Sequence, residues 1–253
     1  MKQRREMILR LINERLSISL HELEQEFPDV SSMTLRRDLE YLESSGDIIR
    51  TKGGAMSVKA LKGSDSSRQE AAYTDRELTN FDAKMKIAGA ASELIEEGRS
   101  VYFDAGTTVM TFVKHMSAKR LSAITCGPNI ALELASKIST PVTMVGGLLN
   151  RDNLSLSGSA ALEFISTINI DLAVMATSGL SKDAGFTCGN PAEAELKRLV
   201  VKKARRVIVL MDKTKLDRTL PYTFAVPDDV DVLISDADPG EYFDNKAKLI
   251  IAE

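Results

Sequence analysis

Basic and hydroxyl side chains gather early in the chain, in the stretch SSMTLRRDL at 31–39. Guanidinium groups pair with guanine edges or phosphates, and short hydroxyls donate to phosphate oxygens. Two more cations, Arg50 and Lys52, stand beside Gly53-Gly54. The whole chain carries a net charge of −3, which argues against a non-specific coat on nucleic acid. The local segregation of positive charge instead indicates specific DNA binding.

A second chemistry, anion binding, is indicated by FDAGTT at 103–108. Backbone N–H groups of Gly106, Thr107 and Thr108 at the start of a helix can cradle an anion, and the two hydroxyls add donors. Asp104, just before them, can accept hydrogen bonds from ligand hydroxyls. An ordinary strand-to-helix turn with a threonine cap is the alternative, and the motif alone leaves both open.

Further polar and glycine-rich groups follow other strand-like segments, and ligands of open α/β sheets collect beyond the carboxyl ends of strands. Gly146-Gly147 permits a close approach of backbone. Glu193 and Lys197 are spaced i, i+4 on a predicted helix, where a simple ion pair worth ~0.3 kcal/mol is the alternative to a ligand contact. Lys213 follows an apolar strand and can meet a phosphate.

The side chains expected to contact DNA need a rigid support, and the sequence pattern of the first 58 residues predicts one. Apolar spacing predicts helices over 3–15, after a Ser19 cap, and after Ser31 or Ser32 as far as Gly46. DIIRTKGGAMSV at 47–58 predicts a hairpin around the two glycines. Residues 1–58 are therefore predicted to form a winged helix-turn-helix, with the helix-turn-helix at about 20–39.

The third helix must turn Leu35 and Leu39 to the core, so that Arg36 and Arg37 point away from it. A solvated face in which Arg37 pairs with Glu40 is the alternative. The residues expected to contact DNA are Ser31, Ser32, Thr34, Arg36, Arg37, Arg50 and Lys52.

The rest of the chain predicts a polar linker at 59–80 and an α/β domain with a mostly parallel sheet at 81–253. No apolar run reaches the ~20 residues of a membrane span, and the N-terminus lacks the apolar core of a signal peptide. Two cysteines make no disulfide framework, and no His/Cys spacing suggests a metal site. We expect a cytoplasmic protein without membrane contact, metal or cofactor.

The stretch VSSMTLRRDLEYLESSGDIIRTKGGA at 30–55 resembles the helix-turn-helix signature of the DeoR family of bacterial transcriptional regulators. Its Thr-x-Arg-Arg-Asp-Leu core and Gly-Gly-Ala wing carry the likeness, with Lys52 where the family often has histidine. Similar motifs continue in the same order through RELTNFDAKMKIA at 76–88, FDAGTT, VGG, EAELKR and LMDKTK. The resemblance implies a C-terminal domain with a fold like ribose-5-phosphate isomerase and CoA transferases, which senses a phosphorylated sugar or related metabolite.

The resemblance also implies a repressor of a carbohydrate-utilisation operon, active on operator DNA as a homodimer or homotetramer and without enzymatic activity. An isomerase with an added DNA-binding head, using Glu193 or Glu195 as base, is the first alternative; a fold used only for oligomerisation is the second. MATSGLSKD at 175–183 stands where isomerases have an acidic loop, which favours the sensor. The implied effector-binding residues are Arg76, Lys84, Asp104, Gly106, Thr107, Thr108, Gly146, Gly147, Glu193, Lys197 and Lys213.

Overall fold

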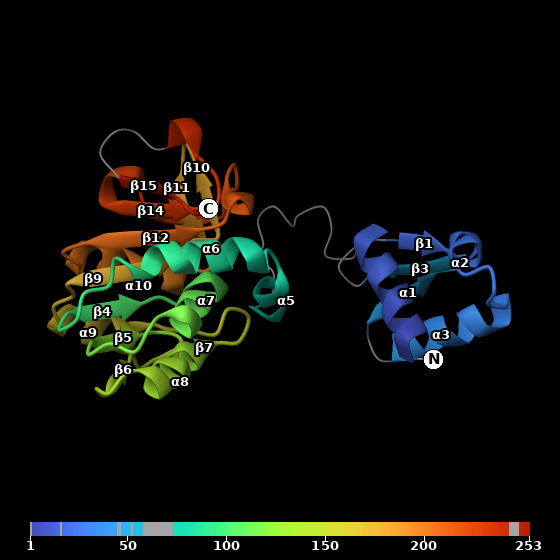
Figure 1. The fold of residues 1–253 in the computed structure, drawn as a ribbon, viewed down its shortest axis with the longest axis horizontal. Coiled ribbons are helices and arrows are strands. Elements are labelled where there is room, and N and C mark those ends of the chain that lie inside the picture. The colour runs from blue at the N-terminus through green and yellow to red at the C-terminus, as the bar shows by residue number, and fades with distance from the viewer. Residues whose placement is uncertain (1, 16, 45–46, 52, 58–72, 243–247) are drawn as a thin grey trace. The chain divides into compact units, whose positions relative to one another are not determined.

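The computed structural model describes residues 2–15, 17–44, 47–51, 53–57, 73–242 and 248–253. The chain divides into two compact units, Met1–Ser66 and Ser67–Glu253 (Figure 1). The linker predicted at 59–80 lies outside the described residues as far as residue 72. Within the described ranges, every helix is too short or too polar to span a bilayer.

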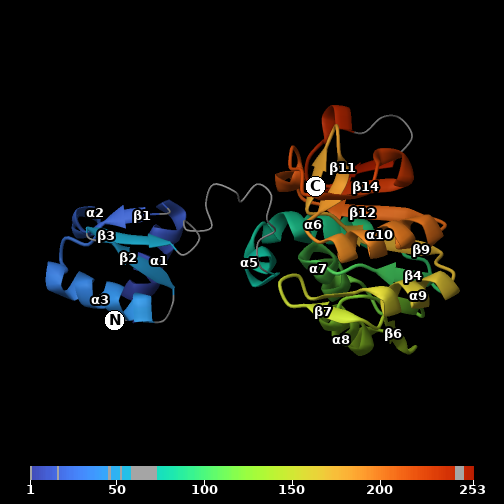
Figure 2. The ribbon, with the colours of Figure 1, turned by 180° about the vertical axis from the view of Figure 1, so that it is seen from behind.

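The N-terminal unit has three helices packed on a small antiparallel sheet (Figures 1 and 2). The apolar faces of the helices share one core, which includes Ile8, Ile12, Leu23, Leu35 and Leu39. The winged helix-turn-helix architecture is confirmed. Its elements are α1 (Lys2–Arg15), β1 (Ser17–Ser19), α2 (Leu20–Glu26), α3 (Ser32–Ser44), β2 (Ile48–Thr51) and β3 (Gly54–Ser57).

Strand β1 was not expected, and it joins the start of the helix-turn-helix to the wing. It pairs antiparallel with β3, giving the order β1-β3-β2. Ser19 ends β1 and caps α2: the Glu22 amide donates to Ser19 Oγ (3.1 Å), and the Ser19 amide donates to Glu22 Oε2 (2.7 Å). A Cβ on Gly54 would lie 2.1 Å from the carbonyl oxygen of Ile18, so this wing position accepts only glycine.

The C-terminal unit is built on a seven-stranded sheet in the order β15-β14-β12-β9-β4-β5-β6, and every strand pair in it is parallel. Near its middle, β4 pairs with β9, with Val101 opposite Leu172. The strands are β4 (Ser100–Phe103), β5 (Ser122–Thr125), β6 (Val142–Met144), β9 (Leu172–Ala176), β12 (Val207–Met211), β14 (Val232–Ser235) and β15 (Lys248–Ile251).

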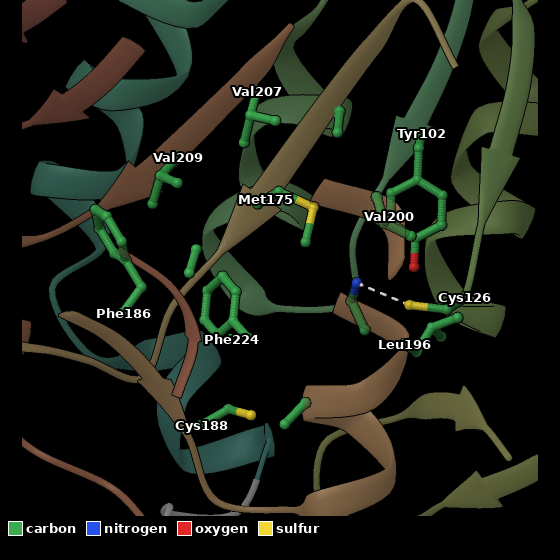
Figure 3. Packing of buried hydrophobic residues seen from close by; sticks show 14 of the residues in the cluster. Tyr102, Cys126, Met175, Phe186, Cys188, Leu196, Val200, Val207, Val209 and Phe224 are labelled. Atoms are coloured by element: carbon green, nitrogen blue, oxygen red, sulfur yellow. Dashed lines mark hydrogen bonds between the residues drawn. The ribbon is translucent and has the colours of Figure 1, made fainter. Parts of the chain in front are cut away.

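Alternate residues of these strands enter two cores, one on each face of the sheet, as expected for buried parallel strands. Tyr102 and Met175 pack with residues of α9 and α10, whereas Phe103 and Val174 pack with residues of α6, α7 and α8 (Figure 3 shows the first core). The helices of this unit are α5 (Tyr73–Leu78), α6 (Phe81–Ser92), α7 (Thr107–His115), α8 (Pro128–Lys137), α9 (Ser159–Thr167) and α10 (Pro191–Lys203).

Two small antiparallel sheets border the large one. One is the hairpin of β7 (Leu148–Asn150) and β8 (Ser155–Ser157), and the other joins β10 (Gly179–Ser181), β11 (Gly185–Cys188) and β13 (Tyr222–Ala225). The α/β architecture with a mostly parallel sheet is confirmed.

Candidate functional site

The third helix of the N-terminal unit presents a basic pair to solvent. Leu35 and Leu39 are buried, whereas Arg36 and Arg37 are exposed. Within the described part of the chain, neither guanidinium forms an ion pair. The alternative partner Glu40 accepts from the Arg50 guanidinium instead, at 2.8 Å. The pair is therefore placed to reach a partner outside the chain.

The opposite side of α3 holds a buried carboxylate that sequence reasoning missed. Asp38 is 2% exposed and accepts hydrogen bonds from Arg4 Nε (2.6 Å) and Arg5 Nε (2.8 Å) of α1. Burial alone would raise the pKa of Asp38, but the two arginines outweigh it and hold that pKa below its ordinary value. The Arg5 guanidinium also lies 3.8 Å from the centre of the Tyr41 ring. The first turn of α1 is thus tied to α3 just behind the basic pair.

The predicted hydroxyl groups lie at the start of α3, and they already have partners. Ser31 Oγ lies 2.9 Å from Thr34 Oγ1 and accepts weakly from the Thr34 amide (3.4 Å). The Ser32 hydroxyl donates to Glu24 of α2. These contacts fix the first turn of α3, and a phosphate oxygen would have to compete with them.

The wing strand is tied to the same helix. Arg50 of β2 donates to Glu40 Oε1 (2.8 Å) and lies 2.9 Å from Glu43 Oε2. Since all three side chains are exposed, the ion pairs are weak and phosphate can exchange with the carboxylates. Lys52 lies outside the described residues.

At the carboxyl edge of the large sheet, three predicted residues meet in one buried ion cluster, defined here as Asp104, Glu193 and Lys197. Lys197 Nζ donates to Asp104 Oδ2 and to the carbonyl of Ala176 (2.9 Å), and lies 3.4 Å from Glu193 Oε1. Burial opposes the charge, but the two carboxylates outweigh it and raise the pKa of Lys197. The pair predicted at Glu193 and Lys197 is therefore an interior ion pair.

The carboxylates of this cluster are also satisfied from other elements. The Ala176 amide donates to Asp104 Oδ2 (2.9 Å), and Asn153 Nδ2 donates to Glu193 Oε2 (2.6 Å). With two carboxylates and one ammonium the cluster carries a charge of −1. A net negative charge favours hydrogen-bond donors such as hydroxyl groups over a phosphate dianion.

The predicted anion cradle lies at the start of α7. Gly106 is the N-cap at φ 144°, and a Cβ there would lie 2.9 Å from Ala176 Cβ. Among the described residues no side chain caps this helix, and free N–H groups at a helix start are where anions bind. Thr107 and Thr108 follow, and both are buried.

Lys84 on α6 is a second buried cation of this unit. Its ammonium donates to the carbonyls of Arg76 and Thr79, the latter at 2.7 Å. Burial lowers the pKa of Lys84 to about 8, although the Asp212 carboxylate opposes that shift. The Arg76 guanidinium lies 5.9 Å from the centre of the Tyr73 ring.

Three other predicted effector-binding residues, Lys213, Gly146 and Gly147, do not belong to the buried ion cluster. Lys213 is exposed, and its amide donates to Asp236 Oδ1 (2.6 Å). Gly146 is exposed, and Gly147 at φ 121° is required because a Cβ there would lie 2.3 Å from the Ser157 carbonyl oxygen. The glycine pair therefore has a structural explanation in the β7–β8 hairpin.

Both cysteines are buried, and no disulfide joins the two. Cys126 is buried, and burial raises the pKa of its thiol to about 12. Its sulfur accepts from the Ala105 amide (3.3 Å; Figure 3). Among the described residues, no cluster of His, Cys, Asp or Glu can hold a metal ion.

Comparison with known proteins covers both units. Residues 4–60 match the family described as DeoR-like helix-turn-helix domain, and residues 79–237 match the DeoR C terminal sensor domain. The HTH-type transcriptional regulator GlpR of Haloferax volcanii is 33% identical over 92% of this chain and 89% of its own length. The HTH-type transcriptional repressor GlcR of Bacillus subtilis is 35% identical over 85% and 80%. Among solved structures, ribose 5-phosphate isomerase A of Methanocaldococcus jannaschii is 16% identical over 55% of each chain, with a TM-score of 0.41.

Proposed function

We propose that this chain, which belongs to the DeoR family of transcriptional regulators, represses a carbohydrate-utilisation operon under the control of a phosphorylated sugar or related metabolite. The chain is a DNA-binding regulator and not an enzyme, because its curated relatives match it along most of their length and are regulators. The observation that carries the DNA-binding assignment is the exposed pair Arg36 and Arg37 on a helix held from behind by Asp38.

The proposed DNA surface consists of the start of α3 and the wing. One recognition helix covers only a few base pairs, so we propose that a homodimer or homotetramer binds a symmetric operator. Arg50 and Lys52 on the wing are assigned to backbone phosphates, which position the protein without reading sequence. The full DNA-contacting set proposed is Ser31, Ser32, Thr34, Arg36, Arg37, Arg50 and Lys52.

Replacing Arg36 or Arg37 with alanine is expected to weaken operator binding by about 1–3 kcal/mol, or about 5- to 150-fold, if the lost side chain reads a base. The duplex is one selected by the wild-type protein from a random library, and affinity is measured by gel shift at fixed salt. Arg15→Ala is the matched control, since Arg15 is an exposed arginine of the same unit that pairs with Glu26. Wild-type affinity in both α3 variants would show that α3 does not form the DNA interface.

The proposed effector site joins the anion cradle of α7 to the buried ion cluster. A phosphate dianion needs several N–H donors and a cation to recover its desolvation. Gly106, Thr107 and Thr108 supply the donors, and Lys84 is the cation. The negative cluster then receives the hydroxyl-bearing end of the molecule. Arg76, Gly146, Gly147 and Lys213 remain proposed members of the site on the family resemblance alone.

Affinity for a sugar phosphate is expected to be constant between about pH 7 and 8 and to fall at higher pH. Lys84 loses its proton near pH 8 in the free protein, and a bound dianion favours the charged form. Binding above pH 8 therefore takes up a proton, and affinity falls by up to about tenfold per pH unit. Calorimetric titration from pH 7 to 9.5, with a sugar phosphate that raises the melting temperature in a screen, measures the slope.

Lys84→Arg is expected to abolish this slope, because an arginine stays protonated throughout the range. Lys86→Arg is the matched control, since Lys86 is exposed on the same helix. An unchanged slope in the Lys84→Arg protein would show that another group carries the proton.

A further inference from the structure

The first residue of α5 is anchored at the carboxyl edge of the large sheet. Tyr73 is 5% exposed, and its amide donates to the carbonyl of Asp152 in the β7–β8 loop (2.8 Å). Its phenol oxygen accepts a hydrogen bond from Asn129 Nδ2 at 2.6 Å. Asn129 lies in the first turn of α8, so the pair joins two elements far apart in sequence.

This pair has hydrogen-bonding capacity that the protein does not use. Asn129 Oδ1 is shielded from solvent and has no hydrogen-bond partner among the described residues. The Tyr73 hydroxyl accepts from Asn129, and within the described part of the chain its own proton goes to no acceptor. Turning the amide by 180° exchanges the roles and still leaves at least one free donor and one free acceptor. Such buried groups are normally satisfied, so a missing partner is indicated.

The pair lies at the same edge as the anion cradle. Strands β4 and β5 are parallel neighbours, with Phe103 opposite Thr125, and they lead into α7 and α8 respectively. The starts of both helices therefore come together at one edge of the sheet. Helix α5 also packs against α7. Tyr73 and Asn129 consequently lie at the same end of the sheet as Gly106–Thr108 and not at the far end of the strands.

A hydroxyl group matches this arrangement better than an anion does. It donates to one atom and accepts from another, which is what an unpaired acceptor beside an unpaired donor requires. A phosphate oxygen accepts only, and it would leave Asn129 Oδ1 facing another acceptor. Burial, with the nearby Glu77 charge, raises the pKa of Tyr73 to about 12, so the phenol keeps its proton at neutral pH.

We propose that Tyr73 and Asn129 form a hydroxyl-recognising subsite of the effector site, so that the effector is a polyhydroxylated phosphate ester. This assignment rests on the proposed function, in which the phosphate occupies the cradle of α7. Neither residue is among the effector-binding residues that the family resemblance implies. The subsite supplies selectivity among phosphate esters, because a molecule without the hydroxyl leaves both buried groups unpaired.

Two classes of probe, phosphate esters with and without hydroxyl groups, separate the subsite from the cradle. Ribose 5-phosphate, fructose 1-phosphate and glycerol 3-phosphate are titrated calorimetrically into the full chain, and methyl phosphate serves as the hydroxyl-free comparison. Tyr73→Phe and Asn129→Ala are each expected to weaken the sugar or polyol phosphate that binds best by about tenfold or more and to change methyl phosphate by less than twofold. Tyr222→Phe, on β13, is the control and is expected to change neither.

Each result decides between the assignments. Loss confined to the hydroxylated probes supports the subsite. Unchanged affinity for every probe overturns the subsite and leaves the effector assignment standing, and so does an equal loss for methyl phosphate, since the pair would then only support the cradle. If the wild-type chain binds no phosphate ester at millimolar concentration, the effector assignment fails and the subsite falls with it.

Discussion

Replacing Lys197 with methionine is expected to lower the free energy of unfolding of the C-terminal unit by about 3–5 kcal/mol. The substitution removes the cation between two carboxylates that are almost fully buried, Asp104 and Glu193. Each then keeps a charge in the interior, or takes up a proton at a cost, without the partner that compensated its desolvation. Urea unfolding followed by circular dichroism measures the change.

Lys202→Met on the same helix is the matched control, because Lys202 is exposed. A triple variant, Asp104→Leu with Glu193→Met and Lys197→Met, is expected to recover part of the loss, since apolar side chains of similar size replace a buried ion cluster at little cost. Equal stabilities for Lys197→Met and Lys202→Met would show that the cluster is solvated in solution.

Replacing Asp38 with asparagine is expected to lower the free energy of unfolding of the N-terminal unit by about 3 kcal/mol and to weaken operator binding. The value lies at the low end for a broken buried pair, because Arg4 and Arg5 are 25% exposed and water can reach them. Since the folded-state pKa of Asp38 is lowered, its contribution is present above the ordinary pKa and is lost as the pH falls through the lowered value.

Thermal unfolding and gel shift are measured on the same preparations of this variant. Asp47→Asn provides the comparison, because Asp47 is an exposed aspartate of the same unit. Retained operator affinity in an Asp38→Asn protein of reduced stability would mean that the tie to α1 does not position α3 for DNA.

Local signals carried the prediction of the N-terminal unit. Leucines at helical spacing, the Ser19 cap and the glycine pair each act within a few residues, so the sequence shows them directly. Strand β1 escaped because its three residues hold only one apolar side chain, Ile18. Its extended state comes from pairing with β3 about forty residues later, which no local pattern records.

The buried ion cluster could not be predicted from local sequence patterns. The i, i+4 spacing of Glu193 and Lys197 was visible, but charged residues are rarely buried, and nothing nearby indicated an interior pair. Asp104 joins them from 93 residues away, because β4 and β9 are neighbours in the sheet. Likewise, Glu40 pairs with Arg50 of strand β2, whereas the helical spacing had suggested Arg37 as its partner.

The central place of β4 beside β9 sets the order in which the two units are completed during synthesis. All the strands of the N-terminal sheet end by Ser57, whereas β4 gains its second neighbour, β9, only when Leu172 has been added, and β9 finds β12 only after residue 207. Domains fold as units while the chain leaves the ribosome, at ~5–20 residues per second. For roughly 10 to 40 seconds, therefore, each new chain carries a finished DNA-reading unit and an incomplete sensor, and a nascent repressor can meet a duplex before any metabolite can control it.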